Sequence, residues 1–124
     1  METVRKVWGE EYIIVNKEYC GKILTLKQQH RCSIHHHKNK NETFLVLEGL
    51  VLIEKNGELF VLHPFQSIDI LAGENHRFTG LTGSRMIEFS SHHEDDDSYR
   101  TSSSERVPDC DFHPLYSKYV KGGD

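Results

Sequence analysis

Residues 42–62 read ETFLVLEGLVLIEKNGELFVL and contain the strongest fold signal of the chain. The first part, 42–48, has the aromatic and β-branched content of a buried strand, and Gly49 ends it. Two further apolar runs, 51–54 and 59–62, flank Asn56-Gly57, a pair typical of the two-residue turn of a β-hairpin. This stretch therefore predicts a buried strand followed by a hairpin.

The same alternation of short strands and turns extends in both directions, from residue 8 to residue 90. Strands are expected upstream and downstream of the hairpin, at 11–15, 22–26, 67–71, 76–79 and 85–89. No segment has the helical period that a crossover between parallel strands requires. The pattern therefore predicts an all-β sandwich or barrel.

After residue 90 the composition changes. An acidic run at 92–97 and the serines 102–104 favour a solvated polar tail. Alternatively, the terminus docks onto the barrel as a short helix through its apolar side chains, Phe112, Leu115, Tyr116, Tyr119 and Val120. We therefore divide the chain into a barrel, 1–92, and a C-terminal segment, 93–124, and keep both alternatives for the latter.

Length and composition limit the classes of function. The 124 residues suit one domain, and the net charge of −4 with scattered basic residues gives no reason to expect a nucleic-acid partner. No apolar run reaches membrane-spanning length and the N-terminus lacks a signal peptide, so we expect no membrane association and a cytoplasmic location. Cys20, Cys32 and Cys110 include no C-x-x-C pair and are expected to be free thiols.

A group of histidines and one glutamate carries the chemical signal. His35 and His37 alternate in an extended segment and so share a face, while Glu42 opens the next strand and His76 follows a glycine turn. Adjacent histidines alone often have no function, but the glutamate and the later histidine favour a site. Imidazoles with one carboxylate suit Mn, Fe, Co, Ni or Zn and do not select among them. We expect one divalent metal ion.

The spacing of these residues resembles the first motif of the cupin superfamily, in which His-x-His is followed by Glu and then Gly. His35, His37, Glu42 and Gly49 occupy its marked positions, although Gln29 replaces its first glycine. Of the second motif only Gly73 and His76 remain. The resemblance implies a single cupin barrel, the double-stranded β-helix or jelly roll, with these two histidines, Glu42 and His76 as metal ligands.

A closer resemblance, reaching to Arg100, is to the cupin domain of bacterial type II phosphomannose isomerases. It rests on several short matches: Val7-Trp8-Gly9, Lys22, the run 33–37, Lys40 with Glu42, Ile87-Glu88, and Asp96-Asp97 before Arg100. His35 stands where those domains have glutamine, which makes the metal's ligand set different. The guanylyltransferase domain that precedes this domain in bifunctional enzymes is absent from the sequence, so we expect a stand-alone version.

This resemblance implies a metal-dependent isomerase or epimerase of a sugar or sugar phosphate. Isomerisation needs a polarised carbonyl and a base, which would be Glu88 or a metal-bound hydroxide. A phosphate needs cations, for which Lys22, Lys40 and Arg100 are the candidates, with Lys22 and Arg100 also grouped with Glu88 as catalytic. The alternative for each is a structural role: solvated lysines, an arginine that neutralises the acidic run, and a paired carboxylate.

Two other functions remain open. The same ligands in this fold also suit a dioxygenase, and a third possibility is a non-catalytic module that binds a sugar or nucleotide sugar. We further expect a homodimer formed through an open sheet edge near the N-terminus, and we interpret Asp69 as a partner that orients a ligand histidine.

Overall fold

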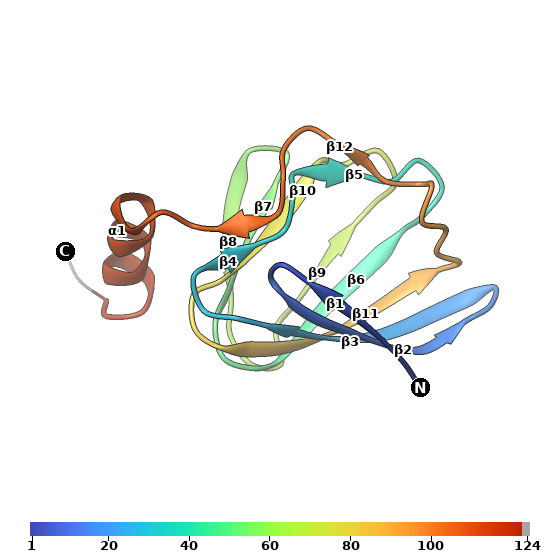
Figure 1. The fold of residues 1–124 in the computed structure, drawn as a ribbon, viewed down its shortest axis with the longest axis horizontal. Helices are drawn as coiled ribbons and strands as arrows, with labels where there is room; N and C mark the ends of the chain where they lie inside the picture. The colour runs from blue at the N-terminus through green and yellow to red at the C-terminus, as the bar shows by residue number, and fades with distance from the viewer. Residues whose placement is uncertain (123–124) are drawn as a thin grey trace.

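The computed structural model describes residues 1–122 and consists of two antiparallel sheets that enclose a barrel (Figure 1). The strands of the six-stranded sheet are, in spatial order, β1 (Glu2–Lys6), β2 (Gly9–Asn16), β3 (Tyr19–Leu26), β11 (Ser84–Ser91), β6 (Glu42–Glu48) and β9 (Ser67–Ile70). The second sheet contains β12 (Tyr99–Arg100), β5 (His35–His36), β10 (His76–Gly80), β4 (His30–Arg31) and β13 (Glu105–Arg106), and β7 (Val51–Lys55) joins β10 to β8 (Glu58–Leu62). The all-β prediction is confirmed.

The hairpin forms where the sequence predicts it. Strands β7 and β8 pair from Val51 opposite Leu62 to Lys55 opposite Glu58. The two residues between them, Asn56 and Gly57, have φ angles of 49° and 82°. Both angles are positive, as the tight turn of a right-twisted hairpin requires, and this explains the Asn-Gly pair.

The apolar core lies between the two sheets, because alternate side chains of each strand point inward. Phe44 and Val46 of β6 and Met86 of β11 meet Ile53 and Phe78 from the facing sheet, and all are at most 5% exposed. Trp8 is part of this core. Its ring meets the ring of Phe78 edge-on, with the centroids 4.9 Å apart.

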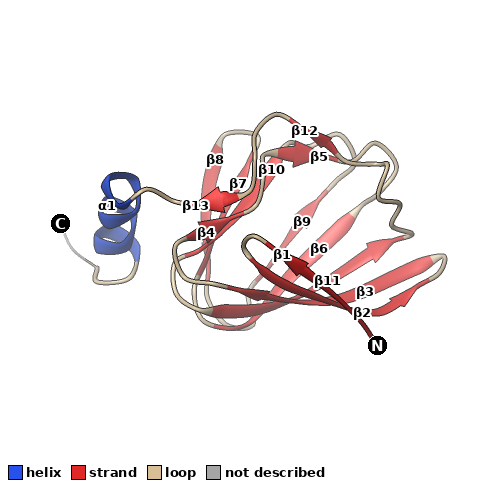
Figure 2. Cartoon of the chain, viewed as in Figure 1, coloured by secondary structure: helices blue, strands red, loops and turns tan. Residues whose placement is uncertain are grey.

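The segment after residue 92 pairs with the second sheet and then forms a helix. Strand β12 pairs with β5 and β13 pairs with β4. Helix α1 (Asp109–Tyr119) packs against the end of the barrel (Figure 2), where Phe112 joins a second apolar cluster with Leu52, Leu81 and Val107. This packing corresponds to the docked alternative. Within residues 1–122, no helix has the length and apolar character needed to cross a membrane.

Strand β1 is absent from the sequence prediction. Its five residues are mostly exposed and polar, so the alternation of apolar and polar residues that identifies the other strands is missing. It forms the edge of the six-stranded sheet and pairs with β2. Its side chains Glu2, Val4 and Lys6 line the cavity described below.

Candidate metal centre and cavity

Three histidines meet at one end of the barrel because β5 and β10 are neighbours. His35 of β5 lies directly opposite His76, the first residue of β10. His37 lies two residues after His35 in the extended chain, so its side chain points to the same side. Gly73, with φ of +88°, forms the turn before β10, and its N–H donates to the His37 carbonyl over 2.7 Å. One potential ligand atom from each histidine lies within 4.8 Å of the others. The three therefore form a group that can hold a metal ion.

Hydrogen bonds to the main chain fix the tautomer of all three rings. The Nδ1 atoms of His35, His37 and His76 lie 2.8, 2.6 and 3.0 Å from the carbonyl oxygens of Ser33, Asp97 and Glu74. A carbonyl oxygen only accepts hydrogen bonds, so each Nδ1 carries the proton and donates it. Each Nε2 is therefore left with a lone pair, which is the form that binds a metal.

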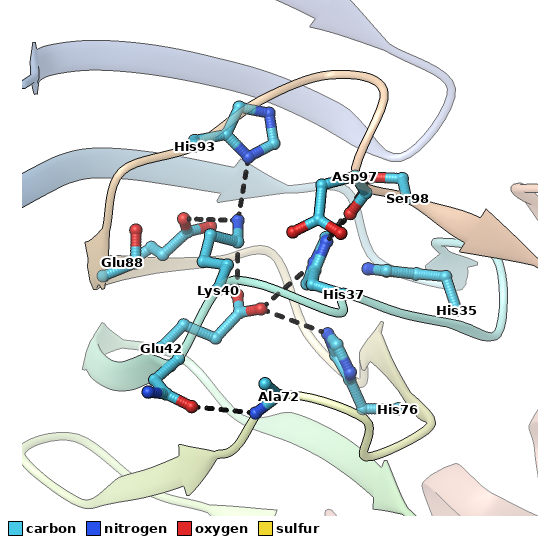
Figure 3. A network of polar contacts seen from close by, with 12 residues as sticks. His35, His37, Lys40, Glu42, Ala72, His76, Glu88, His93, Asp97 and Ser98 are labelled. Atoms are coloured by element: carbon cyan, nitrogen blue, oxygen red, sulfur yellow. Dashed lines mark hydrogen bonds and ion pairs between the residues drawn. The ribbon is translucent and has the colours of Figure 1, made fainter.

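Glu42, at the start of β6, faces these rings (Figure 3). Its Oε2 atom lies 3.2 Å from Nε2 of His37 and 3.5 Å from Nε2 of His76. Among the residues that the structure describes, neither Glu42 Oε2 nor His76 Nε2 has a hydrogen-bond partner, although both atoms are buried. Buried acceptors that face one another without a donor need a cation between them, so this arrangement fits a divalent metal.

The charge states of these groups support the same interpretation. Burial, reinforced by the neighbouring His76, lowers the pKa of His35 to about 3, and burial also lowers the pKa of His76. Both rings are therefore neutral at pH 7. Burial by itself raises the pKa of Glu42, but the contact with His37 and the charge of Lys40 outweigh it and bring the pKa to about 2. Neutral His35 and His76 with an ionised Glu42 are ligands that transition metals prefer.

A row of buried charges continues from Glu42 across the inner face of the six-stranded sheet. The Lys40 ammonium lies 3.9 Å from Glu42 Oε1 and 3.1 Å from Glu88 Oε2. Glu88 on β11 lies opposite Lys22 on β3, and Lys22 lies 3.0 Å from Glu11 Oε1 on β2. We call Glu11, Lys22, Glu88 and Lys40 the charge row.

The two carboxylates of the charge row have opposite pKa shifts. Burial, together with the negative charge of Glu42, raises the pKa of Glu88 despite its lysine neighbours. The pKa of Glu11 is lowered, since Lys22 and Lys6 outweigh the effect of burial. The pKa of Lys22 is raised, because Glu88 and Glu11 outweigh the burial that favours its neutral form. Glu88 is thus the more basic carboxylate and the one closer to the histidines.

His35, His37 and the charge row border one cavity of about 500 Å³. All the site residues predicted from the sequence except His76 line it: Lys22, His35, His37, Lys40, Glu42, Glu88 and Arg100. Arg100 is exposed, on β12 opposite His35, and forms no ion pair with any of residues 1–122. The alternative role for Arg100, neutralising the acidic run, therefore has no supporting ion pair among residues 1–122.

Two residues at the site were not assigned from the sequence. His93 accepts a hydrogen bond from the Lys40 ammonium at 3.0 Å and lies 2.9 Å from the Asp95 carboxylate. The carboxylate of Asp97 accepts the backbone N–H groups of Lys38 and Asn39 at 2.8 and 3.0 Å. Both contacts join segments more than fifty residues apart, and no local spacing in the sequence indicates them.

The interpretation of Asp69 is wrong. Its carboxylate accepts a hydrogen bond from the Thr43 hydroxyl at 2.7 Å on the exposed face of the sheet. The ligand histidines are instead oriented by main-chain carbonyls. A residue that precedes a turn in sequence can face either side of its strand, and Asp69 faces solvent.

Two antiparallel sheets that enclose a barrel, with three histidines and a glutamate grouped at one end, are typical of the cupin superfamily, and this protein is a cupin. Residues 1–102 match the sequence profile of the family described as "Mannose-6-phosphate isomerase C-terminal". The chain belongs to that family. No curated protein matches it.

Solved structures with the same fold have low sequence identity to this chain. KdgF from Halomonas sp. superposes with a TM-score of 0.71 at 17% identity, over 77% of this chain and 90% of that one. A variant of Streptomyces PAC13 with uridine superposes with a TM-score of 0.74 at 11% identity, over 89% of this chain and 88% of that one. Ectoine synthase from P. lautus superposes with a TM-score of 0.69 at 16% identity, over 82% of this chain and 81% of that one. At such identities these similarities establish the fold, and they include proteins of different activities.

Proposed function

We propose that this protein is a metal-dependent isomerase or epimerase that acts on a sugar or sugar phosphate. The observation that carries the proposal is the position of Glu88, a buried carboxylate that faces the same cavity as the histidines and is separated from Glu42 by one ammonium group. We propose His35, His37, Glu42 and His76 as the ligands of one divalent metal. Membership in the mannose-6-phosphate isomerase C-terminal family supports a sugar substrate.

The chemistry is a proton transfer between adjacent carbons. When bound, a divalent metal supplies polarisation of the substrate carbonyl and a contact for the neighbouring hydroxyl oxygen. Glu88 removes the proton from the hydroxyl-bearing carbon and delivers it to the former carbonyl carbon, while the hydroxyl proton passes to the carbonyl oxygen. The raised pKa of Glu88 suits it to this role, since a stronger base removes a carbon-bound proton more readily.

Exchange with heavy water tests this proposal. The manganese-, cobalt- or zinc-loaded protein is incubated in heavy water with a panel of aldose and ketose sugars and their phosphates, and the substrate mass is read. A proton held by Glu88 exchanges with solvent, so we expect deuterium in the substrate. Glu88→Gln should keep the metal and lower the rate by about 100- to 10,000-fold. No exchange over the whole panel, with the metal bound, would contradict an isomerase.

A dioxygenase is the second candidate, because three imidazoles and one carboxylate also suit an iron centre that reacts with oxygen. Oxygen uptake by the iron-loaded protein, without deuterium exchange, would favour it. Tight sugar binding without turnover would favour a binding module.

We also propose a cytoplasmic homodimer. Strand β1 forms the edge of its sheet, and such an edge can pair with a second copy. Sedimentation of the wild-type protein and of a Val4→Pro variant, which removes an N–H donor from β1, tests the dimer.

A further inference from the structure

The two buried lysines of the cavity are already neutralised by carboxylates. The side chains of Lys22 and Lys40 are each 3% exposed, and they lie 3.0 and 3.1 Å from oxygens of Glu11 and Glu88. An anionic group of a substrate placed against either ammonium would also lie near the paired carboxylate, with only the ammonium between them. Because buried charges are weakly screened, that repulsion opposes the attraction to the lysine.

Both lysines instead surround Glu88. Lys22 lies opposite it on the adjacent strand, and the Lys40 ammonium contacts it directly. Lys40 is itself fixed by Glu42 at 3.9 Å and by His93 at 3.0 Å. The Lys40 contact, with the charge of Lys22 on the adjacent strand, therefore holds the Glu88 carboxylate at one position in the cavity.

Arg100 differs from these lysines in both exposure and pairing. It lines the same cavity, its side chain is exposed, and none of residues 1–122 forms an ion pair with it. It lies opposite His35 across the β12–β5 pair, and opposite residues in antiparallel strands have neighbouring side chains. A planar guanidinium can bind a phosphate or carboxylate with two parallel hydrogen bonds.

We infer that Arg100 alone binds the anionic group of the substrate, and that Lys22 and Lys40 are positioning residues for Glu88. The inference rests on the proposed function for the role of Glu88. It limits the substrate to a sugar with one anionic group, held at the rim of the cavity while its hydroxyl and carbonyl oxygens lie at the histidine end. The sequence offers three candidates for phosphate binding, Lys22, Lys40 and Arg100, and of these the inference keeps only Arg100.

Binding constants for a matched pair of ligands test this division. The dissociation constants of mannose and mannose 6-phosphate are measured by calorimetry on the metal-loaded protein, and their ratio gives the contribution of the phosphate. We expect mannose 6-phosphate to bind about tenfold tighter, a typical gain from charge-assisted hydrogen bonds. Arg100→Gln should bring the ratio close to one without changing the affinity for mannose.

Two further variants separate the lysines from the arginine. The double variant Glu11→Gln/Lys22→Met removes a neutral pair and should keep the ratio. Glu11→Gln alone frees Lys22 and should increase the preference for the phosphate. With a substrate that exchanges, Lys22→Met should lower kcat and leave KM unchanged, whereas Arg100→Gln should raise KM.

The inference is overturned if the preference for the phosphate disappears when Lys22 is replaced and persists when Arg100 is replaced. It is also overturned if the ratio of the two dissociation constants is close to one in the wild-type protein, or if neither sugar binds. These results are independent of turnover. If the ratio responds as expected and no deuterium exchange occurs, the isomerase proposal fails while the assignment of Arg100 as the anion-binding residue stands.

Discussion

The inner face of the barrel has two halves that lie along the same strands and are equally buried. On β6, Glu42 faces inward at one end and Val46 at the other, and β11 carries Glu88 and Met86 in the same way. We call these the polar half, Lys22, Glu42, His76 and Glu88, and the apolar half, Leu24, Val46, Phe78 and Met86. No residue of either set is more than 5% exposed.

Equal burial has opposite energetic consequences in the two halves. Burying apolar surface stabilises the fold by about 25 cal/mol per Å². Burying charges costs free energy that their mutual attraction only partly offsets, even when they are paired. The apolar half therefore holds the two sheets together, and the polar half is retained for what it binds. Burial alone therefore does not identify the residues on which stability depends.

The largest effect on stability is expected from removing Lys40, the cation that contacts both carboxylates of the polar half. Lys40→Met leaves Glu88 and Glu42 as buried carboxylates without this ammonium, and should lower the free energy of unfolding by about 3–5 kcal/mol. Adding Glu88→Met should recover most of that loss, since an apolar pair replaces an ionic one. Urea unfolding of the metal-free proteins measures both. A double variant no more stable than Lys40→Met would show that the polar half contributes to stability in its own right.

Truncation in the apolar half should cost slightly less and leave the metal site intact. Met86 is fully buried, and Met86→Ala leaves a cavity that should cost about 2–5 kcal/mol. Phe89, three residues further along β11 and 49% exposed, provides the matched control, with a change within about 0.5 kcal/mol for Phe89→Ala. Metal affinity should be unchanged in both variants. A loss of affinity in Met86→Ala would show that the halves are coupled.

A smaller effect is expected at Asp97, which contacts the segment that carries His37. Asp97→Ala leaves the backbone N–H groups of Lys38 and Asn39 without their acceptor and should cost about 1–3 kcal/mol. The main-chain carbonyl that orients His37 remains in this variant, but the segment that carries it loses its carboxylate contacts to Lys38 and Asn39, so metal affinity should also fall, by about tenfold. Asp96→Ala, on the exposed neighbour, should change neither quantity.

The sequence predicts the apolar half and the three histidines well, and for the same reason. The strands at 42–48, 51–54 and 59–62 rest on local alternation and on the Asn-Gly turn, which act over a few residues. His35 and His37 share a face through the same alternation, and His76 is placed by the turn at Gly73.

The supporting contacts are not predictable in this way. The hydrogen bond from His37 to the Asp97 carbonyl joins residues 60 positions apart, and the contact of Lys40 with His93 joins residues 53 apart. Strand β1 and the pairing of β12 with β5 depend on tertiary packing, since neither strand has an apolar alternation of its own. The pairing state of Lys22, Lys40 and Arg100 is likewise visible only once the strands are assembled.

We propose that one divalent metal is bound by Nε2 of His35, His37 and His76 together with Glu42. Titration of the chelator-treated protein with cobalt(II), followed by its visible absorption, tests this most directly. We predict saturation at one cobalt per chain. Affinity should fall by about 100-fold or more in His76→Ala, and should not change in His36→Ala, where the ring stacks on Tyr99 with the centroids 5.1 Å apart. An absence of saturable binding, or equal affinity in the wild-type protein and His76→Ala, would contradict the claim.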